Sequence, residues 1–185
     1  MRELSLNILD VAQNSISAGS KHICIDVTRS EQDDRLVIRM TDDGCGMTPE
    51  QIEQVTDPFY TTRTTRKVGL GVPLFKMAAE MTGGTFSITA ETGKGTRAEA
   101  FFVPSHMDMT PLGDINATIG ILIRCNPDLD FLFHHKTDAG EFTLNTEELR
   151  GVLGGDVSLD HPDIMEWIEG FLQEQTDIIS GGSMI

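Results

Sequence analysis

A carboxylate followed by two closely spaced glycines ends an apolar segment in the first quarter of the chain. Asp42 comes directly after residues 36–41, whose β-branched composition is typical of a buried strand, and Gly44 and Gly46 follow it. Glycines at this spacing let a ligand approach the main chain, because they add no side chain. A carboxylate at the strand end can accept a hydrogen bond from a ligand amine. These residues form a candidate ligand site, although a plain acidic β-turn has the same composition.

A second group with ligand chemistry lies on the first expected helix, residues 3–18. Apolar residues recur there at helical spacing, and Asp10 and Asn14 stand four positions apart, so they project from one face. A carboxylate and an amide oxygen at this spacing are ligands suited to a hydrated Mg²⁺. The alternative interpretation is the solvated face of an ordinary amphipathic helix.

A cationic segment rich in hydroxyl groups precedes another expected helix. Residues 57–71 have little apolar periodicity and close on two glycines, and a helical pattern resumes at Val72. The N–H groups and dipole at a helix N-terminus favour anions. The three cations are Arg63, Arg66 and Lys67, in a chain that is otherwise strongly acidic. We therefore interpret this segment as a phosphate-binding loop rather than as a mobile surface loop.

The elements that position these residues alternate between helix and strand. Thr48, Pro49 and Gln51 form a capping-box pattern that predicts the start of a short helix ending near Val55. The pattern predicts further helices over residues 3–18 and 72–81, and strands over residues 21–28, 36–41, 85–90 and 96–103. The first two of these strands are expected to form an antiparallel hairpin.

Length and charge limit the function classes. The chain has 185 residues and a net charge of −15, which argues against a nucleic-acid binder, since such a protein needs a basic stripe. No apolar run approaches the ~20 residues of a membrane span. Three widely spaced cysteines favour a reducing cytoplasm. Residues 108–185 carry 3 Lys+Arg against 15 Asp+Glu, so we divide the chain into residues 1–105 and an acidic region, residues 106–185.

Four blocks in one order resemble the GHKL superfamily of ATPases and kinases (the Bergerat fold). Residues 10–15 resemble its N box, and residues 42–47 its first glycine box. Residues 57–71 resemble the phenylalanine-containing box, the ATP lid and the second glycine box, and residues 93–96 the stretch before the last strand. The branch with the greatest resemblance is the histidine-kinase catalytic domain. The resemblance implies an α/β two-layer sandwich, with helices on one face of a mixed, mostly antiparallel sheet, here followed by a small acidic α/β appendage.

The resemblance also implies roles for individual residues. Asp42 would accept a hydrogen bond from the adenine amine, Asn14 would coordinate Mg²⁺, and Arg63 would offset the charge of the γ-phosphate as a catalytic residue. Asp10 stands at the position of the general base. The remaining nucleotide contacts implied for ATP are Gly44, Gly46, Met47, Tyr60, Thr61, Thr62, Arg66, Lys67, Gly69, Leu70, Gly71, Val72 and Thr96.

Three departures from the family leave three functions open, and one of them is Ser17, at a position that is often charged in relatives. Asp10 is one methylene shorter than the glutamate of the hydrolysing branches, so brisk ATP hydrolysis is not expected. No helical segment with a phospho-accepting histidine precedes the N-box-like block, so we expect the chain to lack that part of a sensor kinase. The first hypothesis is an ATP·Mg²⁺-dependent kinase or weak ATPase acting on a protein partner in the cytoplasm. The alternatives are a nucleotide-gated protein-binding switch and an anti-sigma-type serine kinase.

The acidic region resembles no family that we can name. Its pattern predicts helices over residues 112–123 and 163–173, a hairpin of residues 130–136 and 141–144, and a helix starting at Asn145. His134 and His135 invite a metal or phospho-acceptor interpretation. Neighbouring strand residues point to opposite faces, which disfavours a shared metal.

Overall fold

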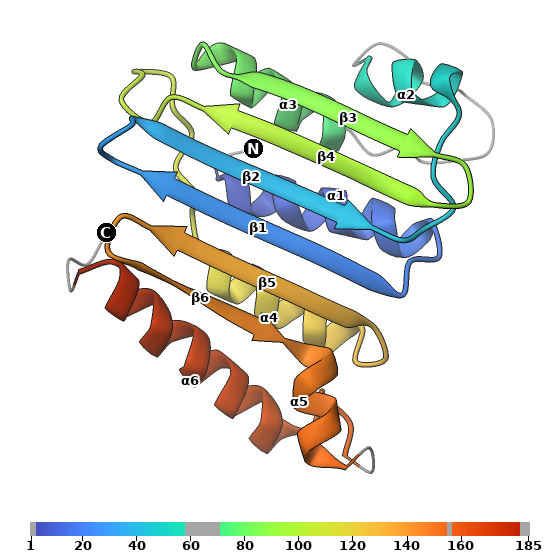
Figure 1. The fold of residues 1–185 in the computed structure, drawn as a ribbon, viewed down its shortest axis with the longest axis vertical. Coiled ribbons are helices and arrows are strands. Elements are labelled where there is room, and N and C mark those ends of the chain that lie inside the picture. Colours follow the sequence, from blue (N-terminus) through green and yellow to red (C-terminus); the bar gives the residue numbers. More distant parts are fainter. Residues whose placement is uncertain (1–2, 58–70, 155–156, 182–185) are drawn as a thin grey trace.

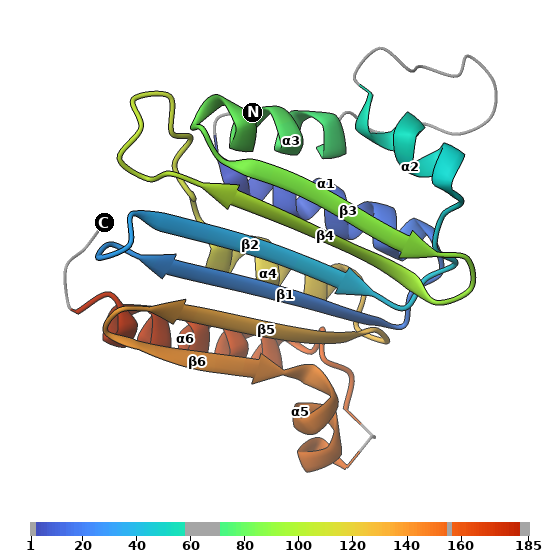
Figure 2. The same cartoon turned by 45° about the horizontal axis from the view of Figure 1, so that its top comes forward.

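The computed structural model describes residues 3–57, 71–154 and 157–181, in which helices and strands form two layers (Figures 1 and 2). The helices are α1 (Leu4–Ser17), α2 (Pro49–Thr56), α3 (Gly71–Met81), α4 (Ile115–Cys125), α5 (Thr146–Leu153) and α6 (Pro162–Ile179). The strands are β1 (His22–Ser30), β2 (Arg35–Asp42), β3 (Thr85–Glu91), β4 (Gly95–Phe102), β5 (Asp130–Thr137) and β6 (Gly140–Asn145).

One six-stranded sheet runs through both parts of the chain. Its order is β3-β4-β2-β1-β5-β6, and every neighbouring pair is antiparallel except β1 and β5, which are parallel. The helices α1, α3, α4 and α6 cover one face of it (Figures 1 and 2). The predicted fold class, a two-layer α/β structure with a mostly antiparallel sheet, is confirmed.

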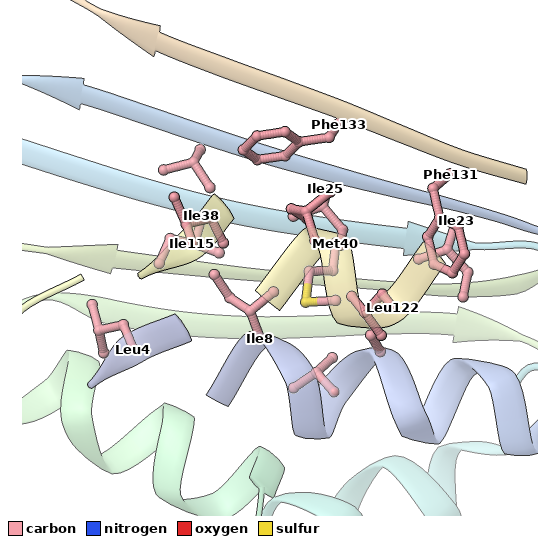
Figure 3. Close-up of a cluster of buried hydrophobic side chains, with 14 of the residues drawn as sticks. Leu4, Ile8, Ile23, Ile25, Ile38, Met40, Ile115, Leu122, Phe131 and Phe133 are labelled. Carbon is pink, nitrogen blue, oxygen red and sulfur yellow. The ribbon is translucent and has the colours of Figure 1, made fainter. Parts of the chain in front are cut away.

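The core lies between the sheet and the helices, because the central strands alternate. Ile23, Ile25 and Val27 of β1 are buried, and the residues between them are partly exposed. They meet Leu4 and Ile8 of α1 together with residues of β2, α4 and β5 (Figure 3). Burying each large aliphatic side chain contributes about 1.5–3 kcal/mol, so this cluster is the main source of stability for the sheet and for what it positions.

Helix α1 is the central helix of the layer, with α3 on one side and α4 on the other. Its expected apolar residues are buried, as the periodicity predicts. Asn7, a polar residue of the same helix, is also buried, with 2% exposure. Helix α1 contacts the sheet and two neighbouring helices, so less of its surface is exposed to solvent than in an amphipathic surface helix. This explains why Asn7 is buried.

The opposite face of the sheet is charged. Arg39 on β2 lies between Glu99 on β4, at 2.7 Å, and Asp26 on β1, at 3.6 Å. His134 on β5 lies within 3.4 Å of both Asp26 and Glu141. The hydrogen bond from Arg39 holds the pKa of the Glu99 carboxyl below its ordinary value. This polar surface explains why no helix covers this face in the described part of the chain.

Residues 106–181 extend the sheet rather than forming a separate layer. Strand β5 pairs with β1, so Ile23 lies opposite Phe131, and residues from both sides of position 105 share one hydrophobic core. The expected hairpin is confirmed, and His134 and His135 lie on opposite faces as predicted. The division at residue 105 remains a division of sequence and charge.

Two helices of this region differ in length from the prediction. Helix α4 begins at Ile115 rather than at residue 112, because Gly113 has a φ of +76° and the Asp114 carboxylate caps the helix by accepting from the Ala117 N–H at 2.8 Å. Helix α6 continues past residue 173 to the buried Ile179. None of the described helices has the length and hydropathy required to span a membrane.

Candidate functional site

The elements that carry Asn14, Asp42 and Thr96 meet at one end of the sheet, at the right of Figure 1. Helix α1 ends there, β2 ends at Asp42, β4 begins beside it, and α2 lies above them (Figure 1). Asp42 is paired with Thr96 across the β2–β4 ladder. Two residues separated by more than fifty positions in the sequence are therefore neighbours, as a shared ligand site requires.

The Asp42 carboxylate is held by two hydrogen bonds. Ser15 Oγ on α1 donates to its Oδ2 at 2.6 Å, and the Gly44 N–H donates to its Oδ1 at 2.9 Å. Asp42 is half-buried, and an ionised carboxylate offers about four lone-pair sites, so it keeps the capacity to accept a further hydrogen bond. The two hydrogen bonds thus fix the orientation of the Asp42 carboxylate and leave lone pairs that can accept from a ligand.

Glycines are required where the loop after Asp42 meets the β3–β4 hairpin. Gly46 has a φ of +65°, and a Cβ atom there would lie 2.0 Å from the Glu91 carbonyl oxygen. A Cβ on Gly95 would lie 1.9 Å from the Asp42 carbonyl oxygen. A Cβ on Gly44 would meet Ser20 Oγ at 2.7 Å. The main chain is therefore packed too closely for side chains at Gly46 and Gly95, and at Gly44 a side chain would collide with the side chains of neighbouring residues.

The same loop is bonded to the turn between α1 and β1. Asp43 Oδ1 accepts from the backbone N–H groups of Lys21 at 2.7 Å and His22 at 2.9 Å. Burial works to raise the pKa of Asp43, but the bonds from His22 and Lys21 outweigh it and hold the pKa below its ordinary value. The Cys45 N–H adds a bond to the Ala18 carbonyl at 3.0 Å. These contacts fix the loop from the side of α1.

Asp10, the first of the two oxygen-bearing residues on α1, lies against the start of α3. A Cβ on Gly71 would lie 2.6 Å from the Asp10 Cβ, so only glycine lets the first turn of α3 come this close to α1. Asp10 is exposed and Asn14 is half-buried, and among the described residues neither side chain has a hydrogen-bond partner. Hard oxygen donors that are not engaged elsewhere fit Mg²⁺.

Of the remaining predicted nucleotide contacts, two lie within the described residues and eight lie outside them. Val72 is buried in the core with 3% exposure, and Met47 is half-buried immediately before the Thr48 cap of α2. Eight predicted contacts lie outside the described residues: Tyr60, Thr61, Thr62, Arg63, Arg66, Lys67, Gly69 and Leu70. For those residues the sequence-based roles stay predictions.

Sequence reasoning missed two residues that organise the site. Ser15 lies on the buried, apolar face of α1, and its hydroxyl donates to Asp42. The Asp43 carboxylate holds the loop to the start of β1. The available signal was a buried hydroxyl on an apolar face, which needs a partner.

Comparison with known proteins identifies the family to which residues 1–106 are similar. Residues 1–106 match the family model described as histidine kinase-, DNA gyrase B- and HSP90-like ATPase. Sensor histidine kinase ZraS of Escherichia coli O157:H7 is 34% identical over 90 residues, which are 49% of this chain and 19% of that protein. Sensor protein SrrB of Staphylococcus aureus (strain NCTC 8325 / PS 47) is 38% identical over 101 residues, which are 52% of this chain and 17% of that protein. The chain thus spans less than a fifth of the length of these relatives.

A solved structure supports the fold. The crystal structure of the N-terminal domain of a DNA repair protein superposes with a TM-score of 0.51 at 14% identity, over 78% of this chain and 52% of that one. At this identity the likeness concerns architecture alone.

Proposed function

Since the chain belongs to the family of histidine kinase-, DNA gyrase B- and HSP90-like ATPases, and carries a kinase-like ATP-binding domain in residues 1–106, we propose that it binds ATP with Mg²⁺ and transfers the γ-phosphate to a protein partner. The observation that carries the proposal is the Asp42 carboxylate, held by Ser15 and Gly44 with acceptor capacity remaining. We place this reaction in the cytoplasm, where ATP is available and free cysteines stay reduced.

The adenine would be recognised at the end of β2. Asp42 accepts a hydrogen bond from the exocyclic amine, which only a base with a donor at that place can supply. Gly44 and Gly46 let the loop beside the proposed adenine position pack against Ser20 and the Glu91 carbonyl, and Thr96 lies across the ladder from Asp42. A hydrogen bond to a charged acceptor contributes about 1.5–3 kcal/mol, enough to select adenine over a base that presents an acceptor there.

The phosphates would lie toward α1 and α3. Asn14, with Asp10 one turn away, is the residue that would hold Mg²⁺, and the metal would neutralise charge on the phosphate oxygens. The backbone N–H groups at the start of α3, which Gly71 allows close to Asp10, favour an anion at the same place. Arg63 and the other cations of residues 57–71 are proposed to contact the phosphates.

A second candidate, a nucleotide-gated protein-binding switch, is favoured by one chain of contacts. Asp43, beside the adenine site, accepts from the Lys21 N–H, and the Lys21 carbonyl accepts from the Asp130 N–H of β5 at 2.9 Å. The acidic C-terminal region is thus linked to the loop after Asp42 through Lys21, by one main-chain bond and one bond to the Asp43 carboxylate. In this alternative, ATP binding changes the surface that a partner meets, with little or no catalysis.

The proposal is tested by calorimetric titration of ATP with Mg²⁺ into the wild-type protein and Asp42→Asn. The amide keeps the shape but places a donor or a weaker acceptor against the adenine amine, so affinity should fall about 10- to 100-fold, equivalent to ~1–3 kcal/mol. Asp33→Asn, in an exposed turn, is the matched control and should bind as the wild type does. Equal affinity for all three proteins would contradict the assignment of Asp42.

Phosphotransfer is tested separately with ATP labelled at the γ-phosphate. The kinase proposal expects label on a protein from the same cell, lost when Asp42 is replaced. Label released only as inorganic phosphate would remove the kinase proposal and leave a weak ATPase. Nucleotide binding without transfer or hydrolysis, but with a partner retained only in the presence of ATP, would favour the switch.

A further inference from the structure

Three side chains with metal-ligand chemistry meet at the same end of the sheet, but on the far side of β1 from Asp42. His22 begins β1, Asp130 begins β5, and Glu147 lies in the first turn of α5. One ligand atom from each lies within 4.8 Å of the others. The three come from separate elements that the parallel β1–β5 pairing and the α5 start bring together (Figure 1).

The spacing of the first two ligands suits a bound ion. His22 Nδ1 lies 3.4 Å from Asp130 Oδ2. This is longer than the ~2.8 Å of a charge-assisted hydrogen bond. Two ligands that each lie ~2.1 Å from a tetrahedral metal are separated by ~3.4 Å. The pair is therefore placed as two ligands of one ion would be.

Arg150 fixes the orientation of the Asp130 carboxylate. Arg150 forms an ion pair with its Oδ1, and Arg150 is itself held by the carbonyl groups of Pro127 at 2.9 Å and Leu129 at 3.0 Å. One carboxylate oxygen is thus occupied by a fixed guanidinium, and the other, Oδ2, is directed toward His22. Outer partners that fix the orientation of a ligand in this way are a usual feature of metal sites.

Glu147 is available as the third ligand. Asn145 caps α5 by accepting from the Glu147 N–H at 3.0 Å, and the Asn145 amide donates to Glu148 at 3.1 Å. The cap therefore uses the neighbouring carboxylate, and among the described residues that of Glu147 has no hydrogen-bond partner.

We propose that His22, Asp130 and Glu147 bind a divalent transition-metal ion of the zinc and cobalt class, with water completing the coordination. One imidazole nitrogen and two carboxylate oxygens suit a borderline metal better than Ca²⁺, which takes six to eight oxygen ligands. The ion would join β1, β5 and α5 and would neutralise part of the local negative charge. This site is distinct from the Mg²⁺ position proposed at Asn14.

The test is titration of Co²⁺ into nucleotide-free protein that carries no polyhistidine tag, followed by absorption spectroscopy. We expect one ion per chain and a spectrum without a thiolate charge-transfer band. His22→Ala and Glu147→Gln should each weaken binding about tenfold or more. Asp130 is left unchanged because it anchors Arg150. A raised thermal unfolding midpoint with Co²⁺ should accompany binding to the folded state.

The matched control is His161→Asn. His161 is an exposed histidine 3.9 Å from a single carboxylate, that of Asp163, and asparagine can also cap α6 in its place. It should bind Co²⁺ as the wild type does. The proposal is overturned by an absence of saturable binding up to about millimolar Co²⁺, by a thiolate band that assigns the ion to a cysteine, or by equal loss in the control.

The metal-site proposal and the ATP-binding proposal can be contradicted independently of each other. His22→Ala keeps the main-chain N–H that bonds Asp43, so the variant should retain ATP binding whether or not the metal site exists. Loss of Co²⁺ binding with retained ATP binding supports the metal site alone.

Discussion

Ser15 in the middle of the helix layer and Asp42 at the end of a central strand are joined by a 2.6 Å hydrogen bond. The bond connects the helix that carries Asn14 to the strand end proposed to bind adenine. Ser15 is buried, with 5% exposure, so its hydroxyl is held in place by the packing of α1. The orientation of the carboxylate therefore depends on the packing of α1 against the sheet.

Ser15→Ala should weaken ATP binding without unfolding the protein. The change removes the donor to Asp42 Oδ2 and leaves the Gly44 N–H as the remaining fixed partner, which costs about 1 kcal/mol, or roughly fivefold in the dissociation constant. Calorimetric titration with ATP and Mg²⁺ measures it. Ser17→Ala, at the exposed end of α1, is the control. Wild-type affinity in Ser15→Ala would show that Asp42 needs no second anchor.

Gly71→Ala should separate α3 from α1. The added methyl group would lie 2.6 Å from the Asp10 Cβ, so one helix must shift, at a cost of about 1–3 kcal/mol in the free energy of unfolding. ATP affinity should fall as well, because Asp10 and the start of α3 lie on the proposed phosphate side. Urea unfolding and nucleotide titration measure the two effects.

The control for this change is Gly151→Ala in α5. A Cβ there meets no atom within 4 Å, so alanine should leave stability unchanged or raise it by about 0.4–1 kcal/mol. If Gly71→Ala behaves like Gly151→Ala, the close approach of α1 and α3 is not needed for stability.

The sequence predicted the elements well because their signals are local. Alternation in residues 21–28 and the capping box at Thr48 each depend on neighbouring residues. The position of the acidic region depended on a pairing that no local pattern encodes. Strands β1 and β5 are parallel neighbours. The apolar alternation in each of them is compatible with an edge strand or with a central strand, so it does not predict that they pair.

The candidate site was predictable to a lesser degree than the fold. Asp42, Gly44, Gly46 and Gly71 are predicted because glycine and carboxylate positions follow the family pattern, and the three glycines lie where neighbouring segments leave no room for a Cβ atom. The roles of Ser15 and Asp43 depend on distances across the fold. Periodicity alone assigns a buried serine to the apolar face and does not identify its partner.

Acid should destabilise the protein through His135. This buried side chain lies among Phe133 and Phe142, and its pKa is lowered to about 4, first by burial and then by the nearby His134. The unfolded chain takes up the proton near pH 6.5, whereas the folded chain does so near pH 4. Stability from this group is therefore unchanged above pH 6.5 and falls by about 3 kcal/mol between pH 6.5 and 4.

Urea unfolding of the wild type and His135→Phe between pH 7.5 and 4 checks this expectation. The phenyl ring keeps the aromatic packing and cannot be protonated, so the variant should lose less stability over this range. His161→Asn, which removes an exposed histidine, should follow the wild type. Parallel curves for wild type and His135→Phe would assign the acid sensitivity to other groups.

A chain shortened to residues 1–106 should be unstable or self-associated. It would lack β5, so β1 would become an edge strand with unpaired N–H and C=O groups, and the core would lose Phe131 and Phe133. Light scattering after size-exclusion chromatography and thermal unfolding measure the outcome. Adding residues 107–185 as a separate chain should restore a compact complex. A monomeric short chain with the unfolding midpoint of the full chain would show that residues 1–106 fold independently.

The pairing of β1 with β5 also sets the order in which the molecule is completed during synthesis. His134 lies opposite Asp26 and 108 positions after it in the chain. Strand β1 therefore has an open edge until residues 130–137 have left the ribosome, and contacts between such distant segments form slowly. The loop after Asp42, which is bonded to the start of β1, reaches its final stability only after this step. A newly made chain thus acquires its proposed ATP affinity after β5 has paired with β1 rather than when residues 1–106 have emerged.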